Sequence, residues 1–405
     1  MGTLVERFQD LDDWEVPNDE DIWDDEEWGT YEAYLPDRLD DMVHPDDGAL
    51  AMAARAEREL GILDDRLSPE LGLGPVEWLL LRSESLSSTH IEGIRCTTRD
   101  LLVYDGAGIL SGDAMPARGV AEASTRLWRA IREFSPRRPI DLDDLCELNE
   151  SFLIGTPSEG LGGSLRTVQN WIGDARPTLR TATFVPPPPD EVEPLMEDLL
   201  RFCNESALPS VAVAAMSHAQ FETIHPFADG NGRTGRALIQ LILRSRGVIS
   251  HTVVPLSAAL VSDRDRYVAE MLPFQTAGHV CDPNGFIRYL CRQCVRASRA
   301  AMAFQRQVGE IRESWGRRVR VRRGSVAYKL LDILPYRPVL TVGTACEATD
   351  ASERNVRDGL QSLTNHAILE PVRQGTRTKA YVASDIVDLL DRFEAMVDAR
   401  PGKRS

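Results

Sequence analysis

The sequence lacks any long hydrophobic run. None of its apolar stretches approaches the roughly 18 residues that a membrane-spanning helix requires, and no early apolar segment resembles a secretory signal. Its seven cysteines are odd in number and scattered, a pattern that suits a reducing compartment better than a disulfide framework. We therefore expect a cytoplasmic protein that has no membrane partner.

Most of the chain also lacks an excess of charge of either sign. The net charge of −17 arises almost wholly in residues 1–47, which contain 18 acidic and 2 basic residues, whereas 44 basic and 45 acidic residues follow. Within residues 1–47, Trp and Tyr are interleaved with carboxylates, a composition typical of disorder. We expect an acidic, disordered tail there. The near neutrality of the remainder neither favours nor excludes a nucleic-acid partner.

One short segment carries most of the functional information. Residues 225–236 read HPFADGNGRTGR, and the preceding residues 211–224 have apolar side chains at helical spacing. Because Pro226 disfavours helical geometry in the residue before it, the helix should end at His225. An imidazole at a helix exit is free to act as a general base toward an incoming hydroxyl.

The glycines of this segment indicate an anion site. Gly230, Asn231 and Gly232 tolerate unusual dihedral angles and let backbone amides converge without side chains in the way. A second helix should begin near Gly232, with Arg233 and Arg236 on one face of its first turn. Cations there oppose the helix dipole, so an anion must compensate, and a polyphosphate can use both the amides and the guanidinium groups.

Asp229 precedes the glycines and supplies an oxygen ligand for the Mg²⁺ that normally accompanies a nucleotide. A P-loop is excluded because no Gly-Lys-Ser/Thr follows the glycines. The alternative is a helix start that is merely basic.

The pattern HxF(x)(D/E)GNGRxxR resembles the signature of the Fic family, whose best-known members transfer AMP from ATP to protein hydroxyls. The resemblance implies that ATP is a substrate and that Mg²⁺ accompanies it. It implies the following roles: His225 deprotonates the target hydroxyl, Asp229 binds Mg²⁺, Gly230, Asn231 and Gly232 form the anion hole, and Arg233 and Arg236 hold the triphosphate. Phe227 would anchor the loop in the core.

A second segment, STHIEG at residues 88–93, also resembles the family, fitting its Ser/Thr-xxx-Glu-Gly/Asn inhibitory motif. The spacing places Ser88 and Glu92 on one helical face, and Gly93 is suited to ending the helix. The resemblance implies that Glu92 pairs with Arg236 and occupies the place of the ATP γ-phosphate. The alternative is an ordinary glutamate on a surface helix.

Two further segments surround this core. Residues 166–173 and 181–185 flank a loop that contains Gly, Asp and Pro, which predicts a β-hairpin. Fic proteins use a comparable flap to register the target by main-chain pairing; a hairpin that merely covers the core is the alternative. Residues 264–272 resemble a family segment near the nucleobase, which makes Tyr267 a candidate adenine contact.

The C-terminal part is predicted to form a separate module. An amphipathic segment at 325–334, helices capped by Thr341 and Ser352, and two strands around a basic loop resemble a winged helix-turn-helix. Such a module binds DNA or serves as a protein docking or dimerisation unit. The candidate DNA contacts are Arg354, Asn355 and Arg357 on the second helix and Arg373, Arg377 and Lys379 on the wing.

With 405 residues, the chain is long enough for two or three domains. We predict a mainly α protein: an acidic tail at 1–47, a helical region with the inhibitory helix at 48–110, a Fic core with a β-hairpin flap at 111–310, and a winged helix at 325–395. The predicted function is AMP transfer to a Ser, Thr or Tyr of a protein, with the chain itself, DNA and a second copy as further candidate partners.

Three alternatives to this function stay open. The same site could remove AMP, with Glu92 orienting water, or could use a different nucleotide-linked donor. In a different class, the chain would be a DNA-binding regulator whose Fic domain senses nucleotide.

Overall fold

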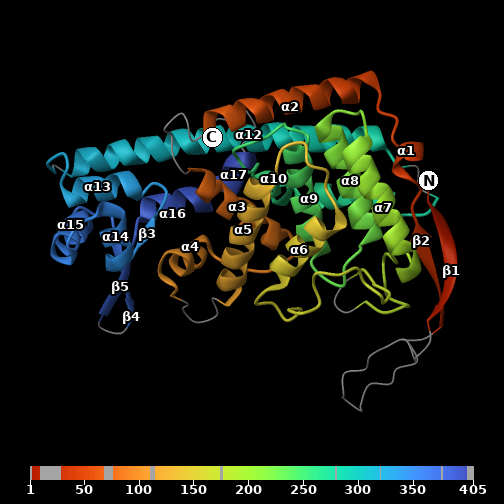
Figure 1. Ribbon diagram of the computed structural model, residues 1–405, viewed down its shortest axis with the longest axis horizontal. Helices are drawn as coiled ribbons and strands as arrows, with labels where there is room; N and C mark the ends of the chain where they lie inside the picture. The colour runs from red at the N-terminus through yellow and green to blue at the C-terminus, as the bar shows by residue number, and fades with distance from the viewer. Residues whose placement is uncertain are drawn as a thin grey trace, which may run out of the picture. The chain divides into compact units, whose positions relative to one another are not determined.

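The computed structural model describes residues 2–9, 29–67, 76–109, 115–173, 177–278, 281–319, 321–374 and 377–398. Helices dominate these residues, which confirms the prediction of a mainly α fold (Figure 1). None of the helices within these ranges combines the length and apolar composition needed to cross a bilayer.

The chain forms two compact units that are each built from separate stretches of sequence. The first comprises Met1–Arg58, Ala130–Val248 and Arg264–Arg292, and the second comprises Glu59–Arg129, Ile249–Asp263 and Gln293–Ser405. This grouping differs from the consecutive blocks 48–110 and 111–310 expected from sequence. The physical reason is that three long helices contribute residues to both units: α2 (Asp47–Leu67), α5 (Met115–Glu133) and α12 (Pro283–Arg318).

The first unit holds the segment at 225–236. Its further elements are β1 (Thr3–Gln9), β2 (Gly29–Leu35), α1 (Leu39–Met42), α6 (Leu142–Leu153), α7 (Pro189–Glu205), α8 (Ser210–Ile224), α9 (Asn231–Ser245), α11 (Arg264–Met271) and the 3-10 helix η3 (Leu272–Phe274).

The second unit holds the segment at 88–93 and the C-terminal module. Its further elements are α3 (Val76–Ile91), α4 (Thr98–Ala107), α10 (Leu256–Val261), α13 (Val326–Ile333), β3 (Val339–Leu340), α14 (Val342–Thr349), α15 (Glu353–Asn365), β4 (Glu370–Gln374), β5 (Arg377–Val382), α16 (Ser384–Asp391) and α17 (Phe393–Asp398).

Helix α8 forms the centre of the first unit. Nearly all of its side chains are buried, and it packs against α7 and α9. Gly235 permits the close approach of α8 and α9, because a Cβ there would lie 2.5 Å from Glu222 Oε1 and 2.9 Å from Phe221 Cδ1. The start of α9 is therefore held rigidly beside the end of α8.

The N-terminal segment differs from the disordered tail expected over residues 1–47. Strands β1 and β2 form an antiparallel pair with Thr3 opposite Leu35 and Gln9 opposite Gly29 (Figure 1). Burial alternates along residues 4–8 of β1 and 29–33 of β2, while Tyr34 is buried next to Ala33. The acidic average over the whole tail hid this local alternation. Residues 10–28, which carry much of the acidic charge, lie outside the described part.

The predicted flap is less regular than a hairpin. Residues 172 and 184 form a single antiparallel bridge, in which the Ile172 N–H donates to the Phe184 C=O at 3.0 Å. Side chains replace the missing ladder: the Gln169 amide donates to the Pro186 C=O at 2.9 Å. The N-terminal hairpin also contacts this segment, since the Tyr31 and Trp171 ring centroids are 5.0 Å apart. We call residues 166–187 the flap segment; its residues 174–176 are not described.

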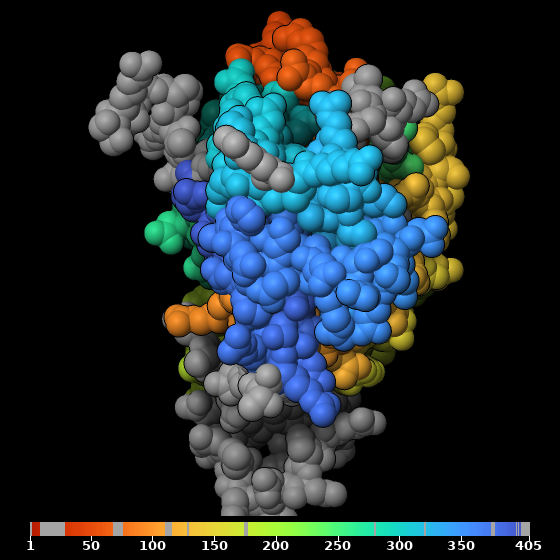
Figure 2. Space-filling view, turned by 90° about the vertical axis from the view of Figure 1, so that its left-hand side faces the viewer, coloured from red at the N-terminus to blue at the C-terminus, as the bar shows by residue number. Residues whose placement is uncertain are grey.

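The C-terminal elements occur in the order that the sequence predicts. Strands β3, β5 and β4 form an antiparallel sheet in that order, and α13, α14 and α15 pack together. The expected caps are present, with the Thr341 hydroxyl accepting from the Thr344 N–H at 3.1 Å and the Ser352 hydroxyl accepting from the Asn355 N–H. These elements form a continuous blue surface in Figure 2. Their assignment as a winged helix stays a prediction.

Candidate functional site

His225 lies where the sequence predicts it, at the exit of α8. Its backbone is left-handed with φ of 51°, and its N–H donates to the Phe221 C=O at 2.9 Å to cap the helix. A side chain in this conformation carries a steric cost of about 1–2 kcal/mol, so the surrounding contacts must hold it in place. The residue is half-buried.

The loop after His225 is closed by the side chain of Asn231. Its Oδ1 accepts the Phe227 N–H at 2.8 Å, and its Nδ2 donates to the Phe227 C=O at 2.7 Å. Both residues are buried, with Phe227 fully inaccessible and 6.2 Å from the Phe221 ring. The side-chain amide of Asn231 thus shapes the loop from within, while the place of its backbone N–H in the anion hole stays a prediction. Phe227 anchors the loop in the core, as expected.

Gly230 begins α9 in a left-handed conformation with φ of 77°. Its C=O accepts the Thr234 N–H at 3.0 Å as the first bond of the helix. The helix therefore starts at Asn231, slightly before the expected Gly232. The first amides of any helix lack intrahelical acceptors, and together with the helix dipole they favour an anion at this end.

Asn149 on α6 supports this loop from outside the motif, and the sequence reading missed it. Its Nδ2 donates to the Asp229 C=O at 2.8 Å, and the residue is fully buried. A Cβ added to Gly230 would lie 3.0 Å from that nitrogen, so the glycine is needed for close approach as well as for its φ. No spacing rule links Asn149 to residues some eighty positions later.

The two motif arginines are buried near the start of α9. Arg233 is 9% exposed and Arg236 is 3% exposed, and Arg233 Nη1 donates to the Phe152 C=O. Two cations at the positive end of a helix create a strongly positive site, because little water is available to screen them. This arrangement suits a polyphosphate.

Asp229 is exposed, and its Oδ1 accepts the Gly230 N–H at 2.5 Å. Its remaining lone pairs can serve a hard cation, so the residue fits the expected Mg²⁺. Within the described ranges no group of three or more His, Cys, Asp or Glu side chains could hold a metal by itself.

Tyr267 on α11 is buried, with 6% exposure, and its hydroxyl lies 2.7 Å from His218 Nε2. Burial, with a further contribution from Arg236, lowers the pKa of His218 to about 3, so this imidazole is neutral. His218 thus packs within the core. In this conformation Tyr267 presents little ring surface to a nucleobase, and its role as an adenine contact stays a prediction.

The segment at 88–93 ends α3. The helix stops at Ile91, and Gly93 has φ of 78°, with its N–H donating to the His90 C=O at 3.0 Å. Ser88 is buried inside the helix, while Glu92 is exposed in the turn that follows. The expected helix end at Gly93 is present, but Glu92 lies one residue beyond the helix. Its pairing with Arg236 stays a prediction.

Helix α3 is firmly anchored in the second unit. The Glu84 carboxylate accepts the Ser257 N–H at 2.7 Å and the Ser257 hydroxyl at 2.6 Å, and all of these groups are buried. The Arg82 guanidinium is inaccessible and pairs with Asp105. These contacts hold α3 in place, and the segment at 88–93 forms the end of this helix.

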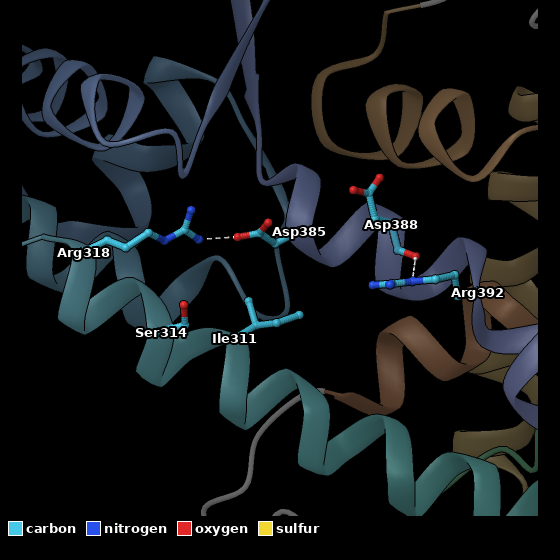
Figure 3. A pocket seen from close by; sticks show the side chains of 6 residues that line it. All are labelled: Ile311, Ser314, Arg318, Asp385, Asp388 and Arg392. Atoms are coloured by element: carbon cyan, nitrogen blue, oxygen red, sulfur yellow. Dashed lines mark hydrogen bonds and ion pairs between the residues drawn. The ribbon is translucent and has the colours of Figure 1, made fainter. Parts of the chain in front are cut away.

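The candidate DNA contacts on the C-terminal module are all exposed: Arg354, Asn355, Arg357, Arg373, Arg377 and Lys379. Arg357 Nε donates to Glu353 at 2.9 Å, which neutralises part of the charge on α15. The same unit contains a polar cavity of about 380 Å³ between α12 and α16 (Figure 3). Its Arg318 pairs with Asp385, and no residue of 225–236 lines it.

Comparisons with known proteins find similarity to the Fic/DOC family. Residues 139–243 match the model of the Fic/DOC family. The chain is 26% identical over 217 residues to the protein adenylyltransferase fic-1 of Caenorhabditis briggsae, a match that covers 51% of this chain and 38% of the relative. It is 41% identical over 70 residues to a probable protein adenylyltransferase of Aquifex aeolicus (strain VF5), covering 17% of this chain and 22% of the relative.

A solved structure resembles this chain over most of the chain's length. The crystal structure of a Fic family protein from Desulfovibrio desulfuricans G20 has a TM-score of 0.52 and 20% identity, covering 84% of this chain and 97% of that chain. This likeness shows the Fic fold. The chain spans well under two thirds of the length of the curated relatives above.

Proposed function

We propose that this chain, whose residues 139–243 match the Fic/DOC family, transfers AMP from ATP to a Ser, Thr or Tyr hydroxyl of a protein. One observation carries the proposal. His225 is held in a left-handed conformation at the end of α8, and the five residues 226–230 connect it to a helix start that bears two buried arginines. A base beside a polyphosphate site is what nucleotidyl transfer requires.

In the proposed reaction, the imidazole of His225 takes the proton of the target hydroxyl. The hydroxyl oxygen forms a bond to the α-phosphorus, the bond from that phosphorus to the oxygen bridging to the β-phosphate breaks, and pyrophosphate leaves. Backbone amides at Asn231 and Gly232 and the guanidinium groups of Arg233 and Arg236 stabilise the negative charge that develops on the phosphates. Tyr267 would lie toward the adenine.

Asp229 would hold Mg²⁺ through the carboxylate oxygen that is not bonded to Gly230, and the bound ion would neutralise charge on the phosphates. The resemblance of STHIEG to the inhibitory motif supports autoinhibition, in which Glu92 pairs with Arg236 and displaces the γ-phosphate. Supporting this role, α3 ends one residue before Glu92 and is anchored by Glu84. The flap segment would align the backbone of the target protein.

The experiment incubates the chain with ATP labelled at the α-phosphate, alone for self-modification and with a cell lysate. Glu92→Gly should raise labelling, and adding His225→Ala to it should abolish labelling at unchanged stability. Release of pyrophosphate from ATP supports transfer, whereas release of AMP from a labelled protein would support the reverse reaction. Labelling that persists without the imidazole would refute the assignment of His225 as base.

The exposed basic residues of α15 and of the β4–β5 hairpin support DNA binding as a second candidate function. Binding through phosphates should weaken steeply with added salt. Arg354→Ala or Arg377→Ala should each reduce the slope of log binding constant against log salt concentration by about one unit. Binding to duplex DNA that is insensitive to salt and to both substitutions would exclude this function.

A further inference from the structure

We propose that Arg166 is a positioning residue that sets the backbone of His225 and links it to the flap segment. The proposal rests on the proposed role of His225 as the base. Three successive carbonyl groups at the exit of α8 all accept hydrogen bonds from Arg166. Its Nη2 donates to the Ile224 C=O at 3.3 Å, its Nε to the His225 C=O at 2.8 Å, and its own N–H to the Pro226 C=O at 2.9 Å.

The same guanidinium also holds both arms of the flap segment. Arg166 Nη1 donates to the Val168 C=O at 3.1 Å, and Nη2 donates to the Pro187 C=O at 2.5 Å. Residues 168 and 187 lie on the two sides of the bridge between 172 and 184. One buried group therefore joins the helix exit to the base of the segment that would align a target.

The chemistry of these contacts requires arginine. The residue is 4% exposed, and burial lowers its pKa to about 10, so it remains a cation at neutral pH. Within the described part of the chain its guanidinium donates only to main-chain carbonyls, and the negative end of the α8 dipole lies beside it. A planar fork with five N–H donors can serve four carbonyls at once, whereas the three donors of a lysine converge on one point.

This clamp has a functional consequence because His225 has an intrinsically unfavourable φ of 51°. Without Arg166 the carbonyls at 224 and 225 would lose their buried donors, and the peptide could relax toward a right-handed conformation that moves the imidazole. The anion site should survive, since Asn231 and Asn149 hold the loop at 227 and 229 independently. Loss of Arg166 should therefore slow transfer without weakening nucleotide binding.

The test compares Arg166→Met and Arg166→Lys with a matched control, Arg246→Met. The Arg246 guanidinium donates to the carbonyls of Cys203, Ser206 and Leu208 at 2.8 to 3.2 Å, so its loss removes the same kind of contact at the other end of α9. All variants carry Glu92→Gly to relieve the proposed inhibition, and the Glu92→Gly chain is their parent. Transfer from α-labelled ATP is measured at saturating ATP, and the dissociation constant of a non-hydrolysable ATP analogue is measured by calorimetry.

We expect Arg166→Met to lower the transfer rate by about 100-fold, the loss typical of a misplaced reacting group, while the dissociation constant changes less than about threefold. Arg166→Lys should recover part of the rate, and Arg246→Met should retain nearly all of it. A second measurement needs no activity: hydrogen exchange of amides at 224–228 and 168–187 should accelerate in Arg166→Met and stay unchanged in Arg246→Met.

The outcomes separate this inference from the proposed function. If the Glu92→Gly chain transfers no label, or transfers it without His225, the proposed function fails, and the exchange measurement still decides whether Arg166 holds both segments. Parent-like exchange in both segments, or a parent-like transfer rate in folded Arg166→Met, would overturn the inference. If Arg166→Met does not fold, the same comparisons apply to Arg166→Lys.

Discussion

Replacing Asn231 by alanine should disrupt the loop between α8 and α9. The substitution removes both hydrogen bonds between its amide and the backbone of Phe227. The Phe227 C=O keeps a donor, because Asn170 Nδ2 lies 2.8 Å away, but the Phe227 N–H is left buried and unsatisfied.

The magnitude follows from these contacts. A buried N–H without an acceptor costs about 1–3 kcal/mol, and the lost bond to the C=O adds about 1 kcal/mol. Alanine is a better helix former than asparagine at the start of α9, which returns a few tenths of a kcal/mol. We expect the free energy of unfolding to fall by about 2–3 kcal/mol. Label transfer should fall at least tenfold, as roughly expected when amides of an anion site are displaced.

Urea unfolding and transfer from α-labelled ATP would be measured side by side, with Asn204→Ala as the control. Asn204 makes the same two-fold pairing with one backbone residue: its Oδ1 accepts the Ile140 N–H at 2.9 Å and its Nδ2 donates to the Ile140 C=O at 2.8 Å. This pair lies outside residues 225–236, so its loss should leave transfer intact. An Asn231→Ala protein with parent stability and parent activity would refute the reasoning.

Three further predictions concern backbone strain, proton binding and packing. The free energy of unfolding of His225→Gly should exceed that of His225→Ala by about 1 kcal/mol, because only glycine adopts φ of 51° without cost. Equal stabilities of the two variants in urea would contradict this. Burial lowers the pKa of His218 to about 3 from 6.5, so the unfolded chain binds the proton more readily. Stability should therefore fall by about 1.4 kcal/mol per pH unit as pH drops below 6.5, and His218→Gln should abolish that part of the slope in urea titrations at pH 4–6; an unchanged slope would show that His218 does not titrate this way. Gly235→Ala should lower the free energy of unfolding by about 1–3 kcal/mol, because the added methyl group overpacks against Glu222. Gly61→Ala, with open space around its Cβ, should be neutral or stabilising by up to about 1 kcal/mol. The melting temperatures of the two variants are compared by thermal unfolding, and equal values would contradict the packing argument.

Local rules predicted the elements around the motif well. The helix exit at His225 follows from Pro226, and the start of α9 follows from the glycines, because both effects act within a few residues along the chain. The same holds for the caps at Thr341 and Ser352. Such features need no knowledge of distant neighbours.

Other features could not be predicted from the sequence. The strands β1 and β2 lie within an acidic segment whose average composition indicates disorder, and their stability depends on partners such as the Val185 C=O, which accepts the Tyr34 N–H at 2.9 Å. The flap segment was expected to be a hairpin, yet its described residues form a single backbone bridge, and the Gln169 side chain pairs with the Pro186 C=O. In both cases contacts remote in sequence outweighed the local pattern.

The sequence by itself determined which chemistry is present: an imidazole, a carboxylate, glycines that bend the chain, and two cations, in an order that leaves room for a phosphate chain. Only the tertiary structure decided how that segment is held. Asn149 and Arg166 come from elements some sixty to eighty residues earlier, and they satisfy carbonyl groups that the bends at 225 and 230 expose. A buried carbonyl must find a donor somewhere, but nothing in its own neighbourhood along the chain specifies which distant side chain will provide it.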